Sequence, residues 1–217
     1  MIKIENVEVI GWKHAIRGMR NPMNSWEKSD TDYCFTKNCN DVACKNKKPG
    51  ICLGENDLDL MMRLRNAGTD HRKFMRMIVV YLDITAPLYW WKEFNTYKVG
   101  TVTNSCSTMH KIHDKEFTLD DFSHEHLDRF SIEVLEWTIR ALNGSREDYL
   151  KSKNKDDWWQ MIQLLPSSYN QKRTIMLNYE VLANIYKSRK DHKLDEWRVL
   201  CKCIEELPHS NIITGER

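Results

Sequence analysis

A short polar segment near the middle of the chain carries most of the groups that could bind a small molecule. The run from Gly100 to Thr108 combines hydroxyl, amide and thiol side chains with one glycine. Such side chains hydrogen-bond to a phosphate or to a pyrimidine edge, and Gly100 permits close approach of a ligand to the backbone. The run is not a Walker loop, because no Gly-Lys-Ser/Thr follows. The alternative interpretation is an ordinary polar turn.

Cys106, inside this run, is a candidate nucleophile. A thiol reacts as its thiolate, and the cations Lys98, His110 and Lys111 close to it in the sequence favour that form. The alternative is that Cys106 is a small packing residue.

A second group of polar residues lies on a helix predicted near the C-terminus. Asn178 and Arg189 are separated by eleven residues, which brings them to within about 20° on a helix and about 16 Å apart along its axis. This separation suits a nucleotide-sized ligand. The alternative is that Asn178 caps the helix and Arg189 pairs with Glu180, Asp191 or Asp195.

Four cysteines fall in a segment without hydrophobic periodicity, at about residues 25–54, namely Cys34, Cys39, Cys44 and Cys52. Four thiols can hold zinc or an iron–sulfur cluster, but the spacing lacks the Cys-x2-Cys pair typical of such sites. A metal site and an insertion with scattered thiols both stay open, and no metal ligand is assigned.

The composition is that of a globular protein, with 217 residues, 41% hydrophobic and 29% charged. Lys and Arg total 33 against 31 for Asp and Glu, a balance that argues against a partner such as polymeric nucleic acid. No apolar run approaches the roughly 20 residues of a membrane span, and the N-terminus lacks a secretory signal. We therefore expect a cytoplasmic protein with no membrane partner.

The elements that must position these groups follow from hydrophobic periodicity and from helix start and stop signals. A strand is predicted over residues 1–10, and a second over 74–84 that is central and covered on both faces. Helices are predicted over 12–20, 56–66, 87–94, 119–142, 156–165, 178–187 and 194–207. Asn56 or Asp57 would cap the helix over 56–66, and Asp120 or Asp121 the helix over 119–142. The apolar face of that long helix would contain Phe130, Val134, Trp137, Ile139 and Ala141.

Two segments resemble a known family. Ala86-Pro87 is followed by a predicted helix, by Thr96-Tyr97-Lys98 and, after seven residues, by Cys106. Further along, Leu165-Pro166 is followed by Asn178, Asn184 and Arg189. Both spacings are similar to those of the flavin-dependent thymidylate synthases (ThyX), in which Arg-His-Arg, seven residues and Ser follow the Ala-Pro helix. His71 falls where that family has a flavin-contacting His.

The resemblance implies a single ThyX-like domain over residues 1–217 with a Cys-rich insertion at about 25–54. Its α+β fold would have a central sheet flanked by helices and a helix-rich C-terminal half. The resemblance also implies a homotetramer that binds FAD and methylates dUMP to dTMP with methylenetetrahydrofolate and NAD(P)H.

Site residues carry over by position. The implied FAD-binding residues are His71, Tyr97, Lys98, Thr101, Asn104, Asn178 and Asn184. The implied nucleotide-binding residues are Glu93, Cys106, Ser107, Thr108 and Arg189. Arg189, which would polarise the pyrimidine, and Cys106 are the candidate catalytic residues.

Several family residues are replaced. Thr96 and Tyr97 stand for an Arg and a His, and arginines of the family are replaced by Thr108, Ile162 and Glu180. Such losses weaken phosphate binding, because a charged hydrogen bond contributes about 1.5–3 kcal/mol. Nearby candidates to replace the lost cations are His110, Lys111, His113 and Arg173. Two alternatives therefore stay beside the first: flavin-dependent modification of another pyrimidine nucleotide, and a non-catalytic homologue that binds flavin or nucleotide.

Overall fold

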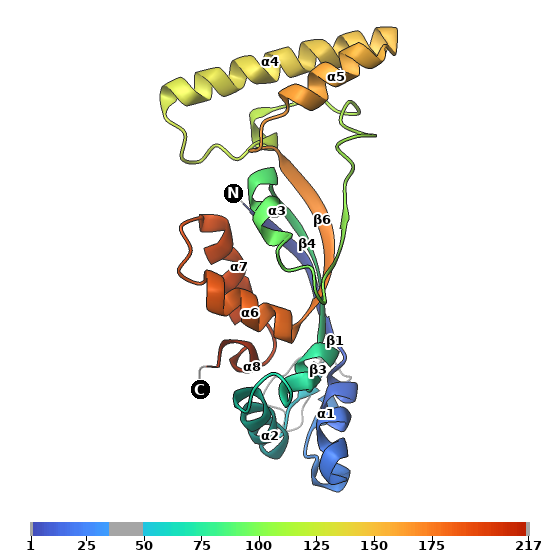
Figure 1. The fold of residues 1–217 in the computed structure, drawn as a ribbon, viewed down its shortest axis with the longest axis vertical. Helices are drawn as coiled ribbons and strands as arrows, with labels where there is room; N and C mark the ends of the chain where they lie inside the picture. Colours follow the sequence, from blue (N-terminus) through green and yellow to red (C-terminus); the bar gives the residue numbers. More distant parts are fainter. Residues whose placement is uncertain (1, 35–49, 216–217) are drawn as a thin grey trace. The chain divides into compact units, whose positions relative to one another are not determined.

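The computed structural model, drawn in Figure 1, describes residues 2–34 and 50–215. The chain divides into two compact units. The first, here called the sheet unit, contains Met1–Val7, Tyr81–Met176 and Asp191–Leu200. The second, called the helical unit, contains Glu8–Val80, Leu177–Lys190 and Cys201–Arg217. The prediction of one domain over residues 1–217 stays a prediction.

The main sheet has four strands in the order β1-β4-β6-β5. Their bounds are Lys3–Ile10 for β1, Val79–Pro87 for β4, Asn170–Asn178 for β6 and Val102–Ser105 for β5. Strand β5 is antiparallel to β6. The predicted central strand is confirmed as β4, although residues 72–77 before it form a 3-10 helix, η3 (Arg72–Met77).

The apolar run of β4 predicts a strand covered on both faces. This prediction is wrong, because only one face of β4 is buried. Val80, Leu82 and Ile84 are buried, whereas Tyr81 between them is 37% exposed. Alternation of this kind is typical of a strand with one buried face. On the other face Asp83 accepts hydrogen bonds from Thr174 at 2.6 Å, from Asn6 at 2.9 Å and from Lys172 at 3.1 Å.

These contacts predict acid sensitivity. The hydrogen bonds from Thr174, Asn6 and Lys172 lower the pKa of Asp83 to about 2. A carboxyl group whose folded pKa is depressed stabilises the fold above its unfolded pKa of about 4, and this contribution disappears as the pH falls towards 2. Asp83→Asn should therefore be less stable than the wild type at pH 6, with a difference that shrinks at pH 3 and below in urea unfolding. Asp120→Asn is the matched control, and an equal difference at all pH values would contradict the prediction.

The core of the sheet unit is aromatic. Helix α3 (Leu88–Phe94) starts directly after Pro87, and its Trp90, Trp91 and Phe94 are at most 1% exposed. The ring of Trp197, from α7 (Asp195–Glu205), lies 4.8 Å from that of Trp90. These rings are core residues, because each is surrounded by other aromatic rings and almost none of their surface reaches solvent.

Two helices form the other part of the sheet unit, α4 (Arg129–Ser152) and α5 (Lys155–Leu164), which lie side by side in Figure 1. The predicted helix over 119–142 is wrong at both ends. Residues Leu119–Asp121 form a separate 3-10 turn, η4, closed by a capping box with Thr118, and α4 is capped by Asp128 instead. The helix continues through Asn143 because that amide bonds the backbone of Phe117 rather than ending the helix.

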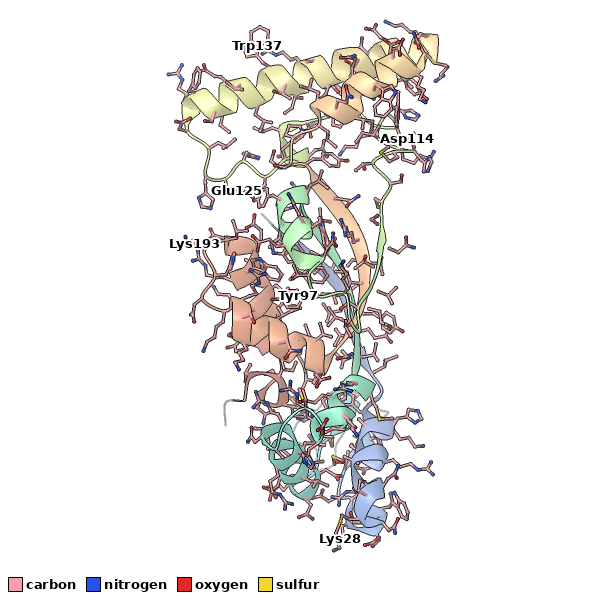
Figure 2. The ribbon with its side chains drawn as sticks, in the orientation of Figure 1. Lys28, Tyr97, Asp114, Glu125, Trp137 and Lys193 are labelled. Carbon is pink, nitrogen blue, oxygen red and sulfur yellow. The ribbon has the colours of Figure 1, made fainter. Side chains whose placement is uncertain are left out.

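The predicted apolar face of the long helix is also corrected. Ile139 is buried, together with Leu135 and Leu142, against Phe117, Phe122 and Met161. The other large residues of the predicted stripe point to solvent: Phe130 is 73%, Val134 50% and Trp137 68% exposed. Figure 2 shows Trp137 projecting outward from α4. Two apolar faces occur on this helix, and periodicity alone did not distinguish them.

The helical unit contains α1 (Trp12–Arg20), α2 (Glu55–Asn66), α6 (Tyr179–Arg189) and α8 (Asn211–Thr214), with the short elements η1 (Asn21–Met23) and η2 (Trp26–Lys28). Two short strands, β2 (Asp32–Cys34) and β3 (Gly50–Cys52), pair antiparallel. Helix α1 begins after Gly11, which has a φ of 96° and where a Cβ would lie 2.0 Å from the carbonyl oxygen of Met77. Only glycine fits this start.

Asp57 does not cap α2, and neither does Asn56; the capping position is Gly54. Instead Asp57 is completely buried and accepts hydrogen bonds from the side chains of Arg20 at 2.7 Å, Ser29 at 2.7 Å and Thr31 at 2.6 Å. Residues 25–31, which lack periodicity, are therefore held to the unit by a polar network. Within the described ranges, no helix combines the length and the apolar character needed to cross a membrane.

Candidate functional site

The sequence-predicted site residues divide between the two units. The sheet unit contains Glu93, Tyr97, Lys98, Thr101, Asn104, Cys106, Ser107 and Thr108, and the helical unit contains His71, Asn178, Asn184 and Arg189.

A pocket of about 300 Å³ lies where α3 ends and β5 begins, in the sheet unit. Helix α3 ends at Phe94, the chain turns through Gly100, where φ is 78°, and β5 starts at Val102. The pocket is lined by Phe94, Asn95, Tyr97, Lys98, Thr101 and Thr103. Its volume is at the lower end of the range for small-molecule sites. Three of the predicted cofactor-binding residues thus share one pocket.

Thr101 gives this pocket a group in need of a partner. Its hydroxyl oxygen is buried, and no protein atom of the described chain hydrogen-bonds to it. Leaving a buried hydroxyl unpaired costs about 1–3 kcal/mol. A polar atom of a ligand in the pocket would remove that cost, while the exposed Lys98 beside it supplies a positive charge.

Tyr97 and Glu93 are both held by Trp197. The Tyr97 ring, labelled in Figure 2, lies 5.8 Å from the Trp197 ring, and the indole N–H donates to Glu93 Oε2 at 3.0 Å. His192 also approaches Glu93, with Nε2 at 3.6 Å. The backbone N–H of Leu194 donates to His192 Nδ1 at 3.2 Å, so in the neutral imidazole the proton is on Nε2 and faces Glu93. Glu93, predicted to bind substrate, is thus part of an internal network at the end of α3.

The polar run after Gly100 is a strand followed by a turn. Asn104 is exposed on β5, opposite Thr174. Cys106 has an exposed thiol, and its backbone is fixed by bonds from its N–H to Lys172 O at 2.9 Å and from Gln171 Nε2 to its carbonyl at 2.8 Å. The interpretation of the whole run as a polar turn is therefore wrong for residues 102–105.

The turn itself begins at Ser107. Its hydroxyl oxygen accepts from the backbone N–H groups of Met109 at 3.2 Å and His110 at 3.0 Å. Thr108, inside the turn, is partly buried. Ser107 therefore stabilises the turn that follows β5.

Arg173, a sequence candidate to replace one of the lost cations, lies next to this pocket. Its guanidinium lies 4.3 Å from the centre of the Trp91 ring, and Nη1 donates to Asn95 Oδ1 at 3.2 Å. Asn95 lines the pocket, so Arg173 fixes one of its walls. Burial lowers the pKa of the Arg173 guanidinium. The signal that could have identified Arg173 is its register opposite Ser105, but β6 was not predicted.

In the helical unit, Asn178 caps α6. Its Oδ1 accepts from the backbone N–H of Val181 at 3.1 Å, as the alternative interpretation expected. Asn184 is exposed on α6, and Arg189 is the last residue of that helix and is partly exposed. His71 is exposed at the start of η3.

Glu180, which stands where the ThyX pattern has an arginine, is neutralised by two arginines of η3. Arg72 Nε donates to it at 3.0 Å, and Arg76 forms a second, shorter ion pair. Burial opposes ionisation of Glu180, but the hydrogen bonds from Arg76 and Arg72 outweigh it, and the pKa lies below its usual value. Arg72 also contacts Asn184 Oδ1 at 3.5 Å.

The described residues contain no cluster of three His, Cys, Asp or Glu that could hold a metal. Cys39 and Cys44, and the side chain of Cys34, lie outside the described residues, so a metal site formed by the four cysteines is not tested. Cys106 is a free thiol.

The α+β architecture, with its central sheet flanked by helices, is that of the flavin-dependent thymidylate synthases. Two crystal structures of ThyX from Helicobacter pylori, both with FAD and dUMP, match with a TM-score of 0.66 and 17% sequence identity. The matches cover 97% and 98% of this chain and 99% and 96% of the other. No protein-family model matches the sequence, and no curated protein does. The predicted fold is confirmed.

Proposed function

We propose that this chain is a cytoplasmic, FAD-dependent thymidylate synthase-like enzyme that methylates dUMP to dTMP with methylenetetrahydrofolate and NAD(P)H. The observation that carries the proposal is the pocket between α3 and β5. It lies at the segment that resembles the ThyX signature and contains a cation, aromatic and hydroxyl groups and the unpaired oxygen of Thr101.

The chemistry of these residues suits part of a flavin dinucleotide, and the rest of the molecule would lie outside the pocket of about 300 Å³. Lys98 would pair with a phosphate, Tyr97 would contact a ring, and Thr101 would hydrogen-bond to the cofactor, with Asn104 at the neighbouring strand. His71, Asn178 and Asn184 belong to the helical unit and are proposed as FAD-binding residues by their positions in the ThyX pattern. Asn178 would use its amide nitrogen, because its oxygen caps α6. When bound, FAD would supply redox chemistry between the nicotinamide co-substrate and the pyrimidine.

The remaining candidates would act on the nucleotide. Arg189 would donate hydrogen bonds to the pyrimidine and stabilise its polarised form. Cys106, directly after β5, has an exposed thiol. Cys106, Ser107 and Thr108 would contact the nucleotide by their positions in the ThyX pattern. Glu93 would also bind the nucleotide, and its side chain is oriented by the hydrogen bond from Trp197.

The proposal is tested through Lys98. Lys98→Ala should weaken FAD binding about tenfold or more, because one charge-assisted contact to phosphate is lost. The measurement is a titration of the purified protein with FAD, followed by quenching of flavin fluorescence. Lys92→Ala, an exposed lysine of α3, is the matched control. A wild type that does not bind FAD, or equal affinities for the two variants, would contradict the proposal.

The ion pairs of Glu180 favour a second candidate function, the modification of another pyrimidine nucleotide. A cation of the ThyX pattern is replaced by a carboxylate that is already paired with Arg72 and Arg76. A flavin enzyme acting on another pyrimidine nucleotide fits this change in charge. In such an enzyme, FAD would bind but dUMP would not stimulate NAD(P)H oxidation; in a non-catalytic homologue, no pyrimidine nucleotide would.

We also propose a homotetramer, supported by the exposed apolar face of α4. Phe130, Val134 and Trp137 recur on one face at intervals of three or four residues and stay exposed in the single chain. Exposed apolar patches of this kind mark interaction surfaces.

Trp137→Asp is expected to dissociate the tetramer, because a carboxylate would be buried without a partner in the contact. Sedimentation velocity should show a smaller species at unchanged far-UV circular dichroism. Met23→Asp, at an apolar residue that is 81% exposed in the helical unit, should leave the sedimentation unchanged. A monomeric wild type would exclude the tetramer.

A further inference from the structure

A second pocket lies wholly in the helical unit, between α1 and the segment that ends in β2. We call it the α1 pocket; its volume is about 150 Å³. A cavity of about this volume accommodates one six-membered ring. None of the residues proposed above for flavin or nucleotide binding lines it.

The floor of the α1 pocket is preorganised by the buried carboxylate of Asp57. Arg20, Ser29 and Thr31 line the pocket, and each donates to that carboxylate. Arg20 also donates to the backbone carbonyl of Lys28 at 3.0 Å, so its side chain is held in place with an exposed fraction of 4%. The position of the pocket therefore does not depend on surface side chains alone.

The charge of the α1 pocket is positive. Lys13 and Arg17 lie one turn apart on α1, line the pocket and are exposed. Neither forms an ion pair in the described part of the chain, and no acidic residue is among the lining residues. Arg20 balances Asp57, so Lys13 and Arg17 are two positive charges for which residues 2–34 and 50–215 supply no ion-pair partner.

The walls of the α1 pocket are apolar and aromatic. Ile16 is 5% exposed and lies on α1 between the two cations, and Trp26 is 47% exposed. The Trp26 indole is fixed in orientation because its N–H donates to Asn21 Oδ1 at 2.8 Å. A fixed indole and a branched aliphatic side chain suit a planar ring.

From this arrangement we propose that the α1 pocket binds a small aromatic acid. The ring packs on Ile16 and Trp26, and its carboxylate or phosphate accepts hydrogen bonds from Lys13 and Arg17. Arginine and lysine recognise both anions, and the ring-sized volume excludes a whole dinucleotide. The site is independent of the proposed flavin site.

Three one-ring probes test the proposal by broadening of their fluorine NMR lines on addition of the full chain. 4-Fluorobenzoate carries a carboxylate, 4-fluorophenyl phosphate a phosphate, and 4-fluorobenzamide is neutral. We expect the two acids to bind and the amide to bind at least tenfold more weakly. The tighter of the two acids identifies the source of the natural ligand, an aryl carboxylate or a phosphate ester. Binding of the amide as tight as that of the acids, or no binding by either acid at millimolar concentration, overturns the proposal.

Two variants locate the site. Lys13→Gln/Arg17→Gln should weaken acid binding at least tenfold, whereas Arg63→Gln, at an exposed arginine of α2, should not. Trp26→Leu should weaken binding of all probes, with Trp159→Leu, at a partly exposed indole of α5, as its control. The exchanged cations are exposed, so an unchanged melting temperature is expected and confirms folding. Acid binding that survives the double exchange overturns the assignment.

Discussion

Asp57→Ala is expected to lower the free energy of unfolding by about 3–5 kcal/mol, because it leaves a buried cation without its partner. The side chain of Arg20 is 4% exposed and that of Asp57 0%, with 2.7 Å between Arg20 Nε and Asp57 Oδ1. The exchange also removes the acceptor for the hydroxyl groups of Ser29 and Thr31. Urea unfolding of the purified chain measures the difference.

The control is a carboxylate on the same helix. Asp59 pairs with Arg63 at 2.9 Å, but their side chains are 60% and 69% exposed, so Asp59→Ala should cost less than about 1 kcal/mol. Adding Arg20→Met to Asp57→Ala should restore part of the loss, since no unpaired charge then stays buried. A loss for Asp57→Ala no larger than that for Asp59→Ala would show that the network does not stabilise the unit.

The sequence was most informative where helix ends are chemically marked. Helix α1 has the predicted bounds, Trp12–Arg20, and α5 ends before Pro166 as predicted. Asn178 caps α6 in the structure as in one of the two interpretations. Such caps and stops act within a few residues, so they can be read without knowing what packs on the helix.

Tertiary contacts decided the rest. Strand β6 was missed because its buried positions include Gln171, whose polar side chain hides the alternation that Ile175 and Leu177 continue. The helix predicted over 119–142 ends before Asn143, but the side-chain amide of Asn143 bonds the backbone of Phe117, 26 positions away, and the helix continues. A pattern that considers only near neighbours cannot distinguish these cases.

In the candidate site, too, some residues were predicted from sequence spacing and others depend on tertiary contacts. Lys98 and Thr101 were found from the spacing of a known family, and the structure brings them to one pocket. Arg173 needed the pairing of β5 with β6 before it could be connected to Asn95. Asp57 was predicted as a cap from its position near the start of α2, because nothing in the sequence indicates that Arg20, 37 residues earlier, reaches it.

Arg189→Ala is expected to reduce dUMP-dependent oxidation of NAD(P)H by about 10²–10³-fold, the loss typical when a donor to developing negative charge is removed. The proposed role places the guanidinium on the pyrimidine and not on the flavin, so the variant should bind FAD as the wild type does. Flavin absorbance of the purified variant and the rate of NAD(P)H oxidation with and without dUMP are the two measurements.

Lys190→Ala is the matched control, because it removes a cation from the neighbouring, exposed position at the end of the same helix. Its dUMP-dependent rate should stay within about twofold of the wild type, since surface exchanges away from a site have small effects. Arg189→Lys is a sharper comparison, because it keeps the positive charge but loses the planar fork of donors. If Arg189 acts through oriented hydrogen bonds, the dUMP-dependent rate of this variant should stay low. Full turnover by Arg189→Ala would remove Arg189 from the catalytic role, whereas loss of FAD together with turnover would assign it to cofactor binding.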